Sequence, residues 1–509
     1  MTLPTEEERR IEGLAVGAIA ELLAADGAVL HGEPTVRVTS VYQDSRRAIG
    51  GSLFVARTGD KSTGAAFVPS ALENGAVAVL LDAGAASQSE LREWVVPVVA
   101  AKDVRRLLSK VAEAIYGHPS RSMPLVGITG TNGKTTTALL VERALLAAGT
   151  RPGRLGTIGS SFAGVEADSN LTTPEADDVT RFLAHVRDRA GTQVVMEVSS
   201  HAIVQGRVSG LSFDVAAFTN LTQDHLDFHG SMQAYAAAKR LLFTEFAPRV
   251  SVLNTRDKVG VEFAAVARSE RVLRVGVERD CDVRPLNVEL SSRGMRGDVL
   301  VDGKIQPIST RLVGEHNLEN LLLALGILCA LDVDLEAAVR GWDEVAVPGR
   351  LERCDEPADD IVVLVDYAHT PDALERALAA VRPLTSGRVH CVFGCGGDRD
   401  PTKRPKMGAA VGRLADRVIV TNDNPRTEQP LVIAEAIEAG LHEVGAAYEL
   451  LLDRAKAVEL AILTAQRGDV VLIAGKGHEA YQIVGTVKHA FDDRVEARRA
   501  LALRREGES

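Results

Sequence analysis

The sequence has few of the features that mark several protein classes. Its five cysteines are odd in number and scattered, and no further Cys or His pair accompanies Cys391 and Cys395 at zinc-finger spacing. We therefore expect reduced thiols, with neither disulfides nor a zinc site. Positive charge is also scarce: 58 Lys and Arg against 69 Asp and Glu give a net charge of −11, which argues against a nucleic-acid-binding surface.

No apolar run in the sequence is long enough to cross a bilayer. The most apolar stretch, residues 321–331, is about half the required length, and charged residues at positions 6–10 precede any apolar segment, unlike in a signal peptide. No internal repeat is visible. We therefore expect a soluble, cytoplasmic protein that has no membrane or nucleic-acid partner, with a monomer as the expected state.

A glycine-rich segment at residues 126–137 carries the clearest chemical signal. Its sequence, Val-Gly-Ile-Thr-Gly-Thr-Asn-Gly-Lys-Thr-Thr-Thr, predicts a strand, a tight turn and the start of a helix that continues over residues 138–148. Successive backbone N–H groups of such a turn, with the positive end of the helix, suit a polyphosphate. Lys134 would reach the terminal phosphates, and the Thr135 hydroxyl would bind Mg²⁺.

This segment departs from the usual P-loop pattern at one point. Ile128 stands where that pattern has its first glycine, and Gly130 follows two residues later. The alternative is a small-residue turn between a strand and a helix, with a solvated lysine. The Gly-Lys-Thr sequence and its flanks favour the phosphate site.

The order of strand-like and helix-like segments predicts an α/β protein of three domains. Residues 1–122 mix short strands and helices and include an alternating strand at 36–42. Residues 123–348 alternate strands and helices, which predicts a mostly parallel sheet around the P-loop. Residues 349–509 form a second such series and are expected to be a doubly wound, Rossmann-like domain.

Candidate side chains follow the strands of the second domain, where ligands bind beyond the carboxyl ends of an open α/β sheet. Glu197 lies near the end of one predicted strand, and His201 and His225 follow this strand and the next. A buried carboxylate without a cation is costly, so we interpret Glu197 as a metal ligand. A lone histidine such as His225 is more often a hydrogen-bonded structural residue. Lys239, on a predicted helix at 231–243, is by itself a solvated or snorkelling lysine.

Four predicted strands of the third domain each end in polar and glycine residues. The segments are Asp366-Tyr-Ala-His369, Gly394-Cys-Gly-Gly-Asp-Arg-Asp400, Asn422-Asp-Asn-Pro-Arg426 and Gly475-Lys-Gly-His-Glu479. Decorated surface loops are the alternative, but four in succession favour a binding rim. In the first domain, Asp44-Ser-Arg46 also follows a strand, although taken alone it is more typical of a solvated loop.

Several segments together resemble the Mur ligases of bacterial cell-wall synthesis, over essentially the whole chain. They are Gly130-Thr-Asn-Gly-Lys-Thr-Thr136, Met196-Glu-Val-Ser-Ser-His201, Thr219-Asn-Leu-Thr-Gln-Asp-His-Leu-Asp-Phe-His-Gly230, Gly314-Glu-His-Asn317, Pro348-Gly-Arg350, Asp366-Tyr-Ala-His369 and Asp423-Asn-Pro-Arg426. The resemblance implies an ATP-dependent amide ligase. In that reaction ATP phosphorylates a substrate carboxylate, and an amine then attacks the acyl phosphate. Lys134, Arg350 and Mg²⁺ would offset the charge that builds up.

The resemblance also implies roles in nucleotide and metal binding. The nucleotide would contact Gly130, Thr131, Asn132, Gly133, Lys134, Thr135, Thr136 and, at the adenosine, Asn317 and Asp366. The metals would be served by Thr135, Glu197, His225 and Lys239. Lys239 matches the lysine that the family carbamylates, and a carbamate would turn this cation into an oxygen ligand. The catalytic candidates are Lys134, Lys239, His225 and Arg350.

For the acyl substrate, the resemblance implies a UDP-linked muramyl dipeptide. Its contacts would be Ser45 and Arg46 in the first domain, which would bind the UDP part, and Thr172, Thr173, Ser199, Gln205 and Arg207 in the second. Some relatives have asparagine before the Thr-Thr pair, whereas this chain has Leu171, with Asn170 one place earlier.

For the amine, the resemblance implies diaminopimelate, bound by the third domain. Its contacts would be Arg399, Asp423, Asn424, Pro425, Arg426, Gly475 and Glu479. The planar guanidinium of Arg426 can hold the far carboxylate that lysine lacks, whereas the alternative is a surface arginine after a turn proline. The meso form is expected, and the LL form stays open.

Two other functions are weighed against this one. A folylpolyglutamate synthase would share the P-loop and the carbamylated lysine, but it would not need Asp44-Ser-Arg46 or Asp423-Asn-Pro-Arg426. A nucleotide-regulated binding protein without ligase activity would not need to retain the intact set of Lys134, Glu197, His225 and Lys239.

Overall fold

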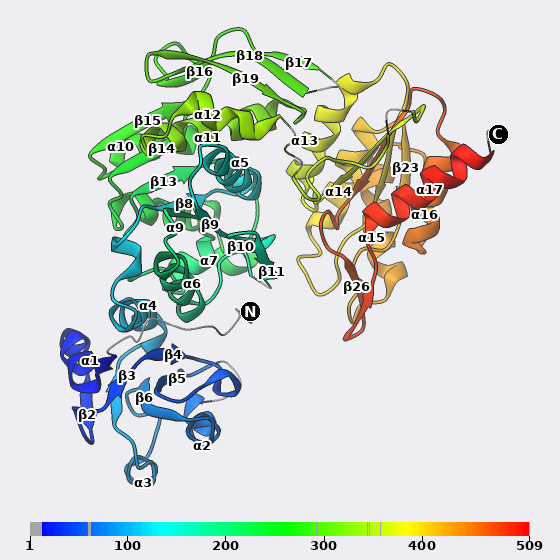
Figure 1. Cartoon of the computed structure of the whole chain (residues 1–509). Helices are drawn as coiled ribbons and strands as arrows, with labels where there is room; N and C mark the ends of the chain where they lie inside the picture. Colours follow the sequence, from blue (N-terminus) through cyan, green and yellow to red (C-terminus); the bar gives the residue numbers. More distant parts are fainter. Residues whose placement is uncertain are drawn as a thin grey trace.

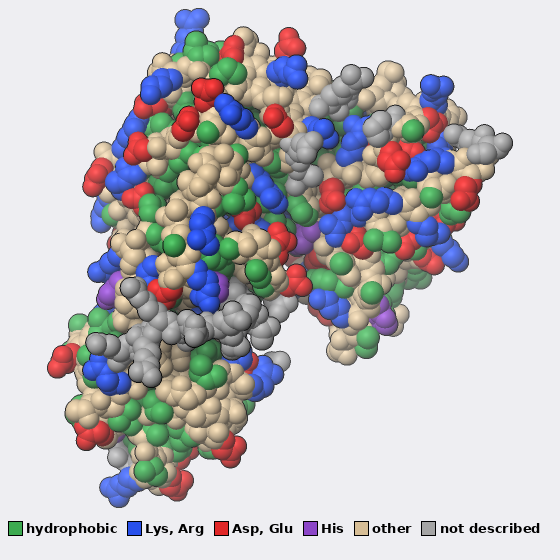
Figure 2. Space-filling model, in the orientation of Figure 1, with side chains coloured by type: hydrophobic (Ala, Val, Ile, Leu, Met, Phe, Trp, Pro, Cys, Tyr) green, Lys and Arg blue, Asp and Glu red, His purple; other side chains and the backbone are tan. Residues whose placement is uncertain are grey.

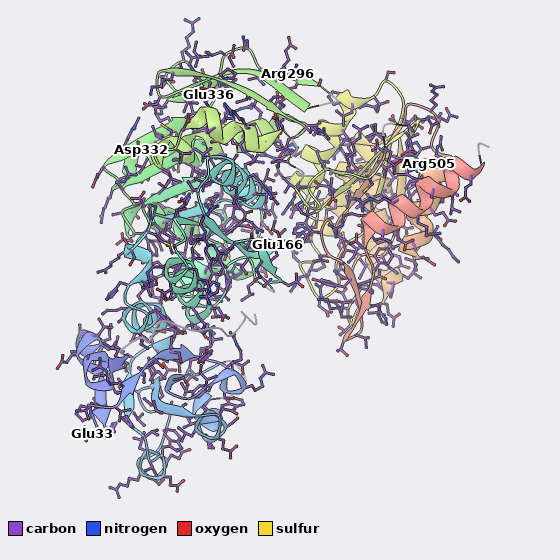
Figure 3. All side chains as sticks on the ribbon, viewed as in Figure 1. Glu33, Glu166, Arg296, Asp332, Glu336 and Arg505 are labelled. Atoms are coloured by element: carbon purple, nitrogen blue, oxygen red, sulfur yellow. The ribbon has the colours of Figure 1, made fainter. Side chains whose placement is uncertain are left out.

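The computed structural model describes residues 13–59, 63–169, 171–291, 294–343, 345, 347–356 and 358–507. The chain folds into three α/β domains, each built around its own β-sheet (Figure 1). In this view the N-terminal domain lies below the central domain, and the C-terminal domain lies beside the central domain. Glu33, Arg296 and Arg505 lie near the outer limits of the three domains (Figure 3). The three-domain α/β architecture predicted from the sequence is confirmed.

The N-terminal domain contains a five-stranded sheet of order β2-β7-β6-β5-β4, in which β2 alone runs antiparallel to its neighbour. The strand predicted at 36–42 is split, because β3 pairs with β1 whereas β4 joins the main sheet. The elements are β1 (Leu14–Ala15), α1 (Val16–Leu22), η1 (Ala24–Asp26), β2 (Val29–His31), β3 (Arg37–Val38), β4 (Ser40–Tyr42), η2 (Ser45–Arg47), β5 (Ser52–Ala56), η3 (Gly64–Phe67), α2 (Val68–Glu73), β6 (Ala76–Asp82), α3 (Gln88–Glu93), β7 (Val98–Ala101), α4 (Val104–Ile115) and η4 (Pro119–Arg121).

The central domain holds a twelve-stranded sheet. Strands β9, β12, β8, β13, β14, β15 and β16 run parallel, as predicted, and antiparallel strands that sequence reasoning missed extend both edges. The elements are β8 (Leu125–Thr129), α5 (Lys134–Ala147), β9 (Pro152–Gly156), β10 (Gly159–Phe162), β11 (Val165–Ala167), α6 (Ala176–Asp188), β12 (Gln193–Glu197), α7 (Ser200–Val204), β13 (Val215–Phe218), α8 (Leu226–His229), α9 (Met232–Thr244), β14 (Val250–Asn254), α10 (Lys258–Val266), β15 (Arg271–Val275), β16 (Val283–Pro285), β17 (Glu289–Ser291), β18 (Gly294–Val301), β19 (Lys304–Thr310), α11 (Glu315–Ala330), α12 (Leu335–Val339) and η5 (Arg340–Trp342).

Both faces of the central sheet are covered, which explains why β8 is apolar on both sides. Val126 and Ile128 pack on the face covered by α5 and α11, whereas Leu125 faces the cluster formed with α6 and α9. Two buried faces hold the strands rigidly, so the loops at their carboxyl ends start from fixed points.

The C-terminal domain has a six-stranded sheet of order β20-β21-β25-β22-β23-β24, parallel except for β20. Helices α13, α14 and α15 pack on one face, and α16 and α17 on the other. The elements are β20 (Glu352–Arg353), β21 (Val362–Asp366), α13 (Pro371–Val381), η6 (Arg382–Leu384), β22 (Val389–Phe393), α14 (Lys403–Leu414), β23 (Arg417–Val420), α15 (Pro430–Glu443), β24 (Tyr448–Leu450), α16 (Arg454–Thr464), β25 (Val470–Ala474), β26 (Tyr481–Val484), β27 (Val487–Ala490) and α17 (Asp493–Gly507).

Two further expectations concern the chain as a whole. All five cysteines lie in the described ranges and are free thiols, as expected. Within those ranges, no helix has the length and apolar character that a bilayer crossing requires. The charged segment at positions 6–10, on which the signal-peptide argument rests, lies outside the described residues.

Candidate active site

The glycine-rich turn leads directly from β8 into α5. Gly130 and Gly133 have positive φ angles of 145° and 88°. A Cβ on Gly130 would lie 1.8 Å from Thr219 Oγ1, and one on Gly133 would lie 2.2 Å from Asn320 Oδ1. Gly133 is the N-cap of α5 and offers no side chain, so protein side chains do not cap the first amides of the helix. This cradle fits a polyphosphate.

Two lysines converge on one carbonyl of this turn. Lys134 Nζ donates to the oxygens of Gly130 and Thr131, each at 2.9 Å, and Lys239 Nζ donates to the same Gly130 oxygen at 2.8 Å. Burial lowers the pKa of Lys134, and burial together with the charge of Lys134 holds the pKa of Lys239 well below its usual range. Lys239, which is only 1% exposed, is thus suited to be a neutral amine.

Glu197 lies on the other side of the first turn of α5. Thr135 Oγ1 donates to both carboxylate oxygens at 3.0 Å, and the Thr157 backbone N–H donates to Oε1 at 2.8 Å. Only hydroxyl and amide groups make these contacts, so the negative charge has no cation in hydrogen-bond contact. This arrangement is compatible with a metal cation.

His225 lies beside His201, with ring centroids 4.7 Å apart and the planes nearly perpendicular. Its Nε2 is 3.4 Å from Asp224 Oδ2. Burial, with a contribution from His225, lowers the pKa of His201 to about 4. A pKa of this value favours the neutral form of the His201 imidazole at physiological pH. Across the described part of the chain, no group of three or more His, Cys, Asp and Glu could hold a metal.

A cleft of about 790 Å³ separates the central and C-terminal domains. It brings together, by their side chains or backbone, many residues predicted from the sequence: Thr172, Thr173, Ser199, Arg207 and His225 on one wall, and Arg399, Asp423, Asn424, Arg426, Gly475 and Glu479 on the other. Figure 2 shows histidine side chains where the two domains meet. The parallel strands of both domains thus direct their carboxyl ends toward one space.

A second, smaller pocket lies between the glycine-rich turn and the C-terminal domain. Its lining includes predicted nucleotide and catalytic residues, namely Asn132, Gly133, Thr136, Asn317, Arg350 and Asp366. Asp366 accepts from the backbone N–H groups of Leu351 (2.8 Å) and Ala368 (2.7 Å), and its burial raises the carboxyl pKa. Asp366 is thus fixed in orientation by the chain that surrounds it.

The residues predicted for the acyl substrate fall into two groups. Arg207 donates to the Thr173 carbonyl at 2.9 Å and to Gln205 Oε1 at 2.8 Å, which ties these residues together beside the cleft. Ser45 and Arg46 do not line the cleft: Ser45 is buried, and Arg46 is 85% exposed and pairs with its own neighbour Asp44. Leu171 lines the cleft, whereas Asn170 lies outside the described residues.

Arg426, which is predicted to bind the amine substrate, is fixed by hydrogen bonds of its backbone and of its side chain. Arg426 has a φ of 51°, its N–H donates to Ile483 O at 3.1 Å, and its Nη1 donates to Gly397 O at 2.8 Å. Beside it, Asn424 Nδ2 donates to Glu479 Oε2 at 2.9 Å. The loops after β23 and β25 therefore form one connected wall.

Sequence reasoning missed several residues of these two cavities. Tyr367 and Lys403 line the cleft, and His316 and Arg376 line the smaller pocket. His316 and Tyr367 lie inside two of the segments on which the family resemblance rests, residues 314–317 and 366–369, so their position could have predicted them. Lys403 begins α14, and Arg376 lies within α13. The apolar spacing of a helix predicts its buried face, but it does not predict which polar side chains line a cavity.

Three family models match the chain in succession. They are described as the Mur ligase family catalytic domain (residues 37–116), the Mur ligase middle domain (128–328) and the Mur ligase glutamate ligase domain (349–477). Among similar proteins, the UDP-N-acetylmuramoyl-L-alanyl-D-glutamate–2,6-diaminopimelate ligase of Gloeobacter violaceus is 43% identical over 95% of this chain and 98% of its own length. The ligase of the same name from Bacillus licheniformis is 40% identical over 92% of this chain and 96% of its own length.

Solved structures give the same result. A structure of a UDP-N-acetylmuramoyl-L-alanyl-D-glutamate–2,6-diaminopimelate ligase has a TM-score of 0.67 and 30% identity, and the match covers 97% of this chain and 99% of that one. The folylpolyglutamate synthase of Mycobacterium tuberculosis, complexed with ADP and AMPPCP, shares the fold at 21% identity and a TM-score of 0.60, over 73% of this chain and 92% of its own. The chain belongs to the Mur ligase family and is an ATP-dependent, ADP-forming ligase.

Proposed function

We propose that this ligase joins diaminopimelate, in its meso form, to UDP-N-acetylmuramoyl-L-alanyl-D-glutamate in peptidoglycan synthesis. The observation that carries the proposal is the cleft, which has candidates for the acyl substrate and His225 on one wall and the Arg399, Arg426 and Glu479 cluster on the other. Candidates for the nucleotide line the smaller pocket. The relatives described above bear the name of this activity. Residues 1–122 would bind the UDP part, 123–348 the nucleotide, and 349–509 the amine.

The glycine-rich turn would hold the triphosphate of ATP. The amides from Gly130 to Thr136 would face the phosphates, and Asn317 and Asp366, on the smaller pocket, would contact the adenosine. Mg²⁺ would be shared by Thr135, Glu197 and phosphate oxygens, which explains why the described protein groups alone do not complete a metal site. When bound, Mg²⁺ would offset negative charge on the phosphates and the attacking carboxylate.

The chain's own cations then support two successive substitutions. A carboxylate oxygen of the acyl substrate attacks the terminal phosphorus, and ADP leaves. The neutral amine next attacks the acyl carbon, and phosphate leaves while a proton is lost from nitrogen. Lys134 and Arg350, on the two domains, would stabilise the charge that grows at the transferring phosphate.

Lys239 would act as a carbamate. Carbamate formation needs a neutral amine and CO₂, and the depressed pKa of this buried lysine favours the neutral form. The product is an anion that would supply an oxygen ligand for a metal near His225.

Selection of the amine would rest on guanidinium groups. Diaminopimelate has a far carboxylate that lysine lacks, and Arg426 can accept it through paired hydrogen bonds. Asp423, Asn424, Pro425, Gly475 and Glu479 would complete this pocket, and Arg399 would add a second cation. A lysine substrate would leave the guanidinium without a carboxylate partner, which costs about 1–3 kcal/mol.

The acyl substrate would lie along Thr172, Thr173, Ser199 and Arg207, with Gln205 holding Arg207. Ser45 and Arg46 lie apart from the cleft, which suits the distant uridine end of a long substrate. We propose a monomer that acts without a membrane or nucleic-acid partner.

The test is an amino-acid screen of ATP-dependent phosphate release in the presence of the UDP-muramyl dipeptide. Turnover with meso-diaminopimelate that exceeds turnover with L-lysine and LL-diaminopimelate is the expected result. Better turnover with lysine would overturn the assignment of Arg426. Turnover with a folate acceptor would point to a folylpolyglutamate synthase, and the absence of any turnover would point to a nucleotide-binding module.

A further inference from the structure

We propose that Lys476 is the positioning residue of the amine pocket: its side chain fixes the loops after β23 and β25 in the arrangement that receives the amino acid. This inference rests on the proposed function of the cleft. Lys476 lies between Gly475 and Glu479, which line the cleft, yet its own side chain is 0% exposed. It therefore affects the pocket through the residues that line it, without facing the cleft itself.

The contacts of Lys476 join two separate segments of the chain. Its Nζ donates to Asn424 Oδ1 at 3.0 Å and to Glu479 Oε2 at 3.4 Å, and Asp423 Oδ1 lies 3.8 Å away. Asn424 in turn donates its amide to the same Glu479 oxygen at 2.9 Å. One ammonium group thus orients three polar side chains that belong to the wall of the cleft.

The backbone on either side of Lys476 restricts the direction of its side chain. Gly475 and Gly477 have φ angles of 116° and 53°. A Cβ on Gly475 would lie 2.5 Å from Asp423 Oδ2, and one on Gly477 would lie 2.6 Å from Tyr367 Cβ. The chain on either side of Lys476 is therefore pressed against its neighbours, and the lysine side chain is directed inward.

Charge explains why a lysine is needed at this place. Asp423 and Glu479 lie close together on the cleft wall, and two carboxylates there would repel each other and draw in water. The Lys476 ammonium lies 3.8 Å from the Asp423 carboxylate and 3.4 Å from the Glu479 carboxylate. Together these three side chains carry a net charge of −1. The remaining negative charge favours the ammonium group of an incoming amino acid. The lysine also keeps the two carboxylates from moving apart.

Burial makes this ammonium sensitive to the loss of its partners. Desolvation lowers the pKa of Lys476, whereas the nearby Asp423 raises it. An uncharged replacement would release the loops, and the cost should appear in the binding of the amine. ATP binds at the glycine-rich turn, which Lys476 does not touch, so its binding should be unchanged.

The experiment compares Lys476→Met and Lys476→Gln with the control Lys488→Met. Lys488 also faces the Tyr481 ring, at 3.6 Å against 5.6 Å for Lys476, but it is exposed on β27. The KM for each substrate is measured by phosphate release with the other two substrates saturating, well below the melting temperature of each variant. KM does not depend on how much of the protein is folded.

We expect Lys476→Met to raise the KM for the amine about tenfold or more, with the KM for ATP and for the UDP-muramyl dipeptide unchanged within about twofold. Lys476→Gln keeps a donor for Asn424 without the charge and should give a smaller rise. Lys488→Met should behave as the wild type. Equal changes in all three KM values, a fall in kcat alone, or the failure of both variants to fold would overturn the proposal, because each indicates a purely structural lysine.

This outcome is separable from the proposed function. If the wild-type enzyme prefers another amino acid, the diaminopimelate assignment fails, and the same comparison is made with the preferred amine. The Lys476 proposal then stands or falls on its own KM values.

Discussion

The side-chain amide of Asn132 donates to Asp372 Oδ2 at 3.2 Å, which links the glycine-rich turn of the central domain to the first turn of α13. Asp372 is also 3.1 Å from Arg376, a residue of the smaller pocket. One carboxylate thus connects the glycine-rich turn to the C-terminal domain, so its removal tests how the two domains meet.

Asp372→Ala should loosen this connection. A hydrogen bond of this kind contributes about 1 kcal/mol, so we expect about a fivefold rise in the KM for ATP. Small-angle scattering should show a larger radius of gyration. Glu435→Ala, which removes an exposed acid from α15, is the matched control. Unchanged scattering and an unchanged KM would mean that the contact does not hold the domains together.

Lys134→Met should abolish most turnover while the fold persists. Without the ammonium, charge at the transferring phosphate is less stabilised, and kcat should fall about 10²–10³-fold. Phosphate release gives the rate, and thermal unfolding checks the fold. Lys258→Met, on the exposed start of α10, should leave both unchanged. A Lys134→Met enzyme with near-normal kcat would remove this lysine from the catalytic group.

Arg426→Ala should change amine preference more than nucleotide use. The loss of a charged, paired contact to the far carboxylate should lower kcat/KM for diaminopimelate about 10–100-fold. The value for L-lysine, which has no such carboxylate, should change little. The ratio of the two values, measured by competition, is the readout. Equal loss for both amines would assign Arg426 a structural role only.

Activity should depend on CO₂ through Lys239. Its pKa is depressed, so between that lowered value and about 10.4 the folded chain carries fewer protons at this site than the unfolded chain. The contribution of this group to stability therefore rises with pH across that window and is lost as pH falls through the folded pKa. A protonated amine does not react with CO₂, so the loss of activity in CO₂-depleted buffer should be greater at lower pH.

The measurement is phosphate release in CO₂-depleted buffer at two pH values, with and without added bicarbonate. We expect bicarbonate to restore activity, and ¹³C NMR with labelled bicarbonate to show a carbamate signal that Lys239→Ala lacks. Full activity without CO₂ would rule out the carbamate.

Breaking the buried pair of Arg454 and Asp493 should destabilise the C-terminal domain. Both side chains are 0% exposed and joined at 2.7 Å, and Arg454 also donates to the carbonyls of Asn422 (3.2 Å) and Ala474 (2.9 Å). Asp493→Ala leaves a buried guanidinium that has carbonyl partners but no carboxylate beside it, which should lower the free energy of unfolding by about 3–5 kcal/mol.

Urea unfolding is the measurement for this pair. The partly exposed ion pair of Arg499 and Glu496 offers the control, because Glu496→Ala should cost less than about 1 kcal/mol. Similar losses from both variants would show that burial adds nothing to this pair.

Sequence reasoning located the cleft residues well because strand ends in an α/β sheet share one edge. The polar segments ending at His369, Asp400, Arg426 and Glu479 follow buried strands, and all four contribute to the cleft. Helix 231–243 was also predicted within a residue at each end, since Ser231 caps α9 by accepting from Ala234 N–H at 3.2 Å. Local chemistry is sufficient for such features.

Other features depend on contacts that no local pattern records. The contact of Asn132 with Asp372 joins residues 240 positions apart, and neither has a spacing that predicts it. Lys476 looks like a loop lysine between glycines, and only its tertiary neighbours make it buried. The antiparallel strands β10, β11 and β17 were missed because strands of three or four residues are too short to show a clear apolar period. Strands β18 and β19 are longer, but Gly297 and Pro307 interrupt their pattern.

The carbonyl of Gly130 serves both Lys134 and Lys239. A phosphate that draws Lys134 toward itself frees one lone pair of this oxygen and moves a positive charge away from the second lysine. If the turn holds the nucleotide as proposed, nucleotide occupancy and the chemical state of Lys239 would be coupled through a single backbone atom. The order in which nucleotide and bicarbonate reach the enzyme should consequently alter how fast turnover begins.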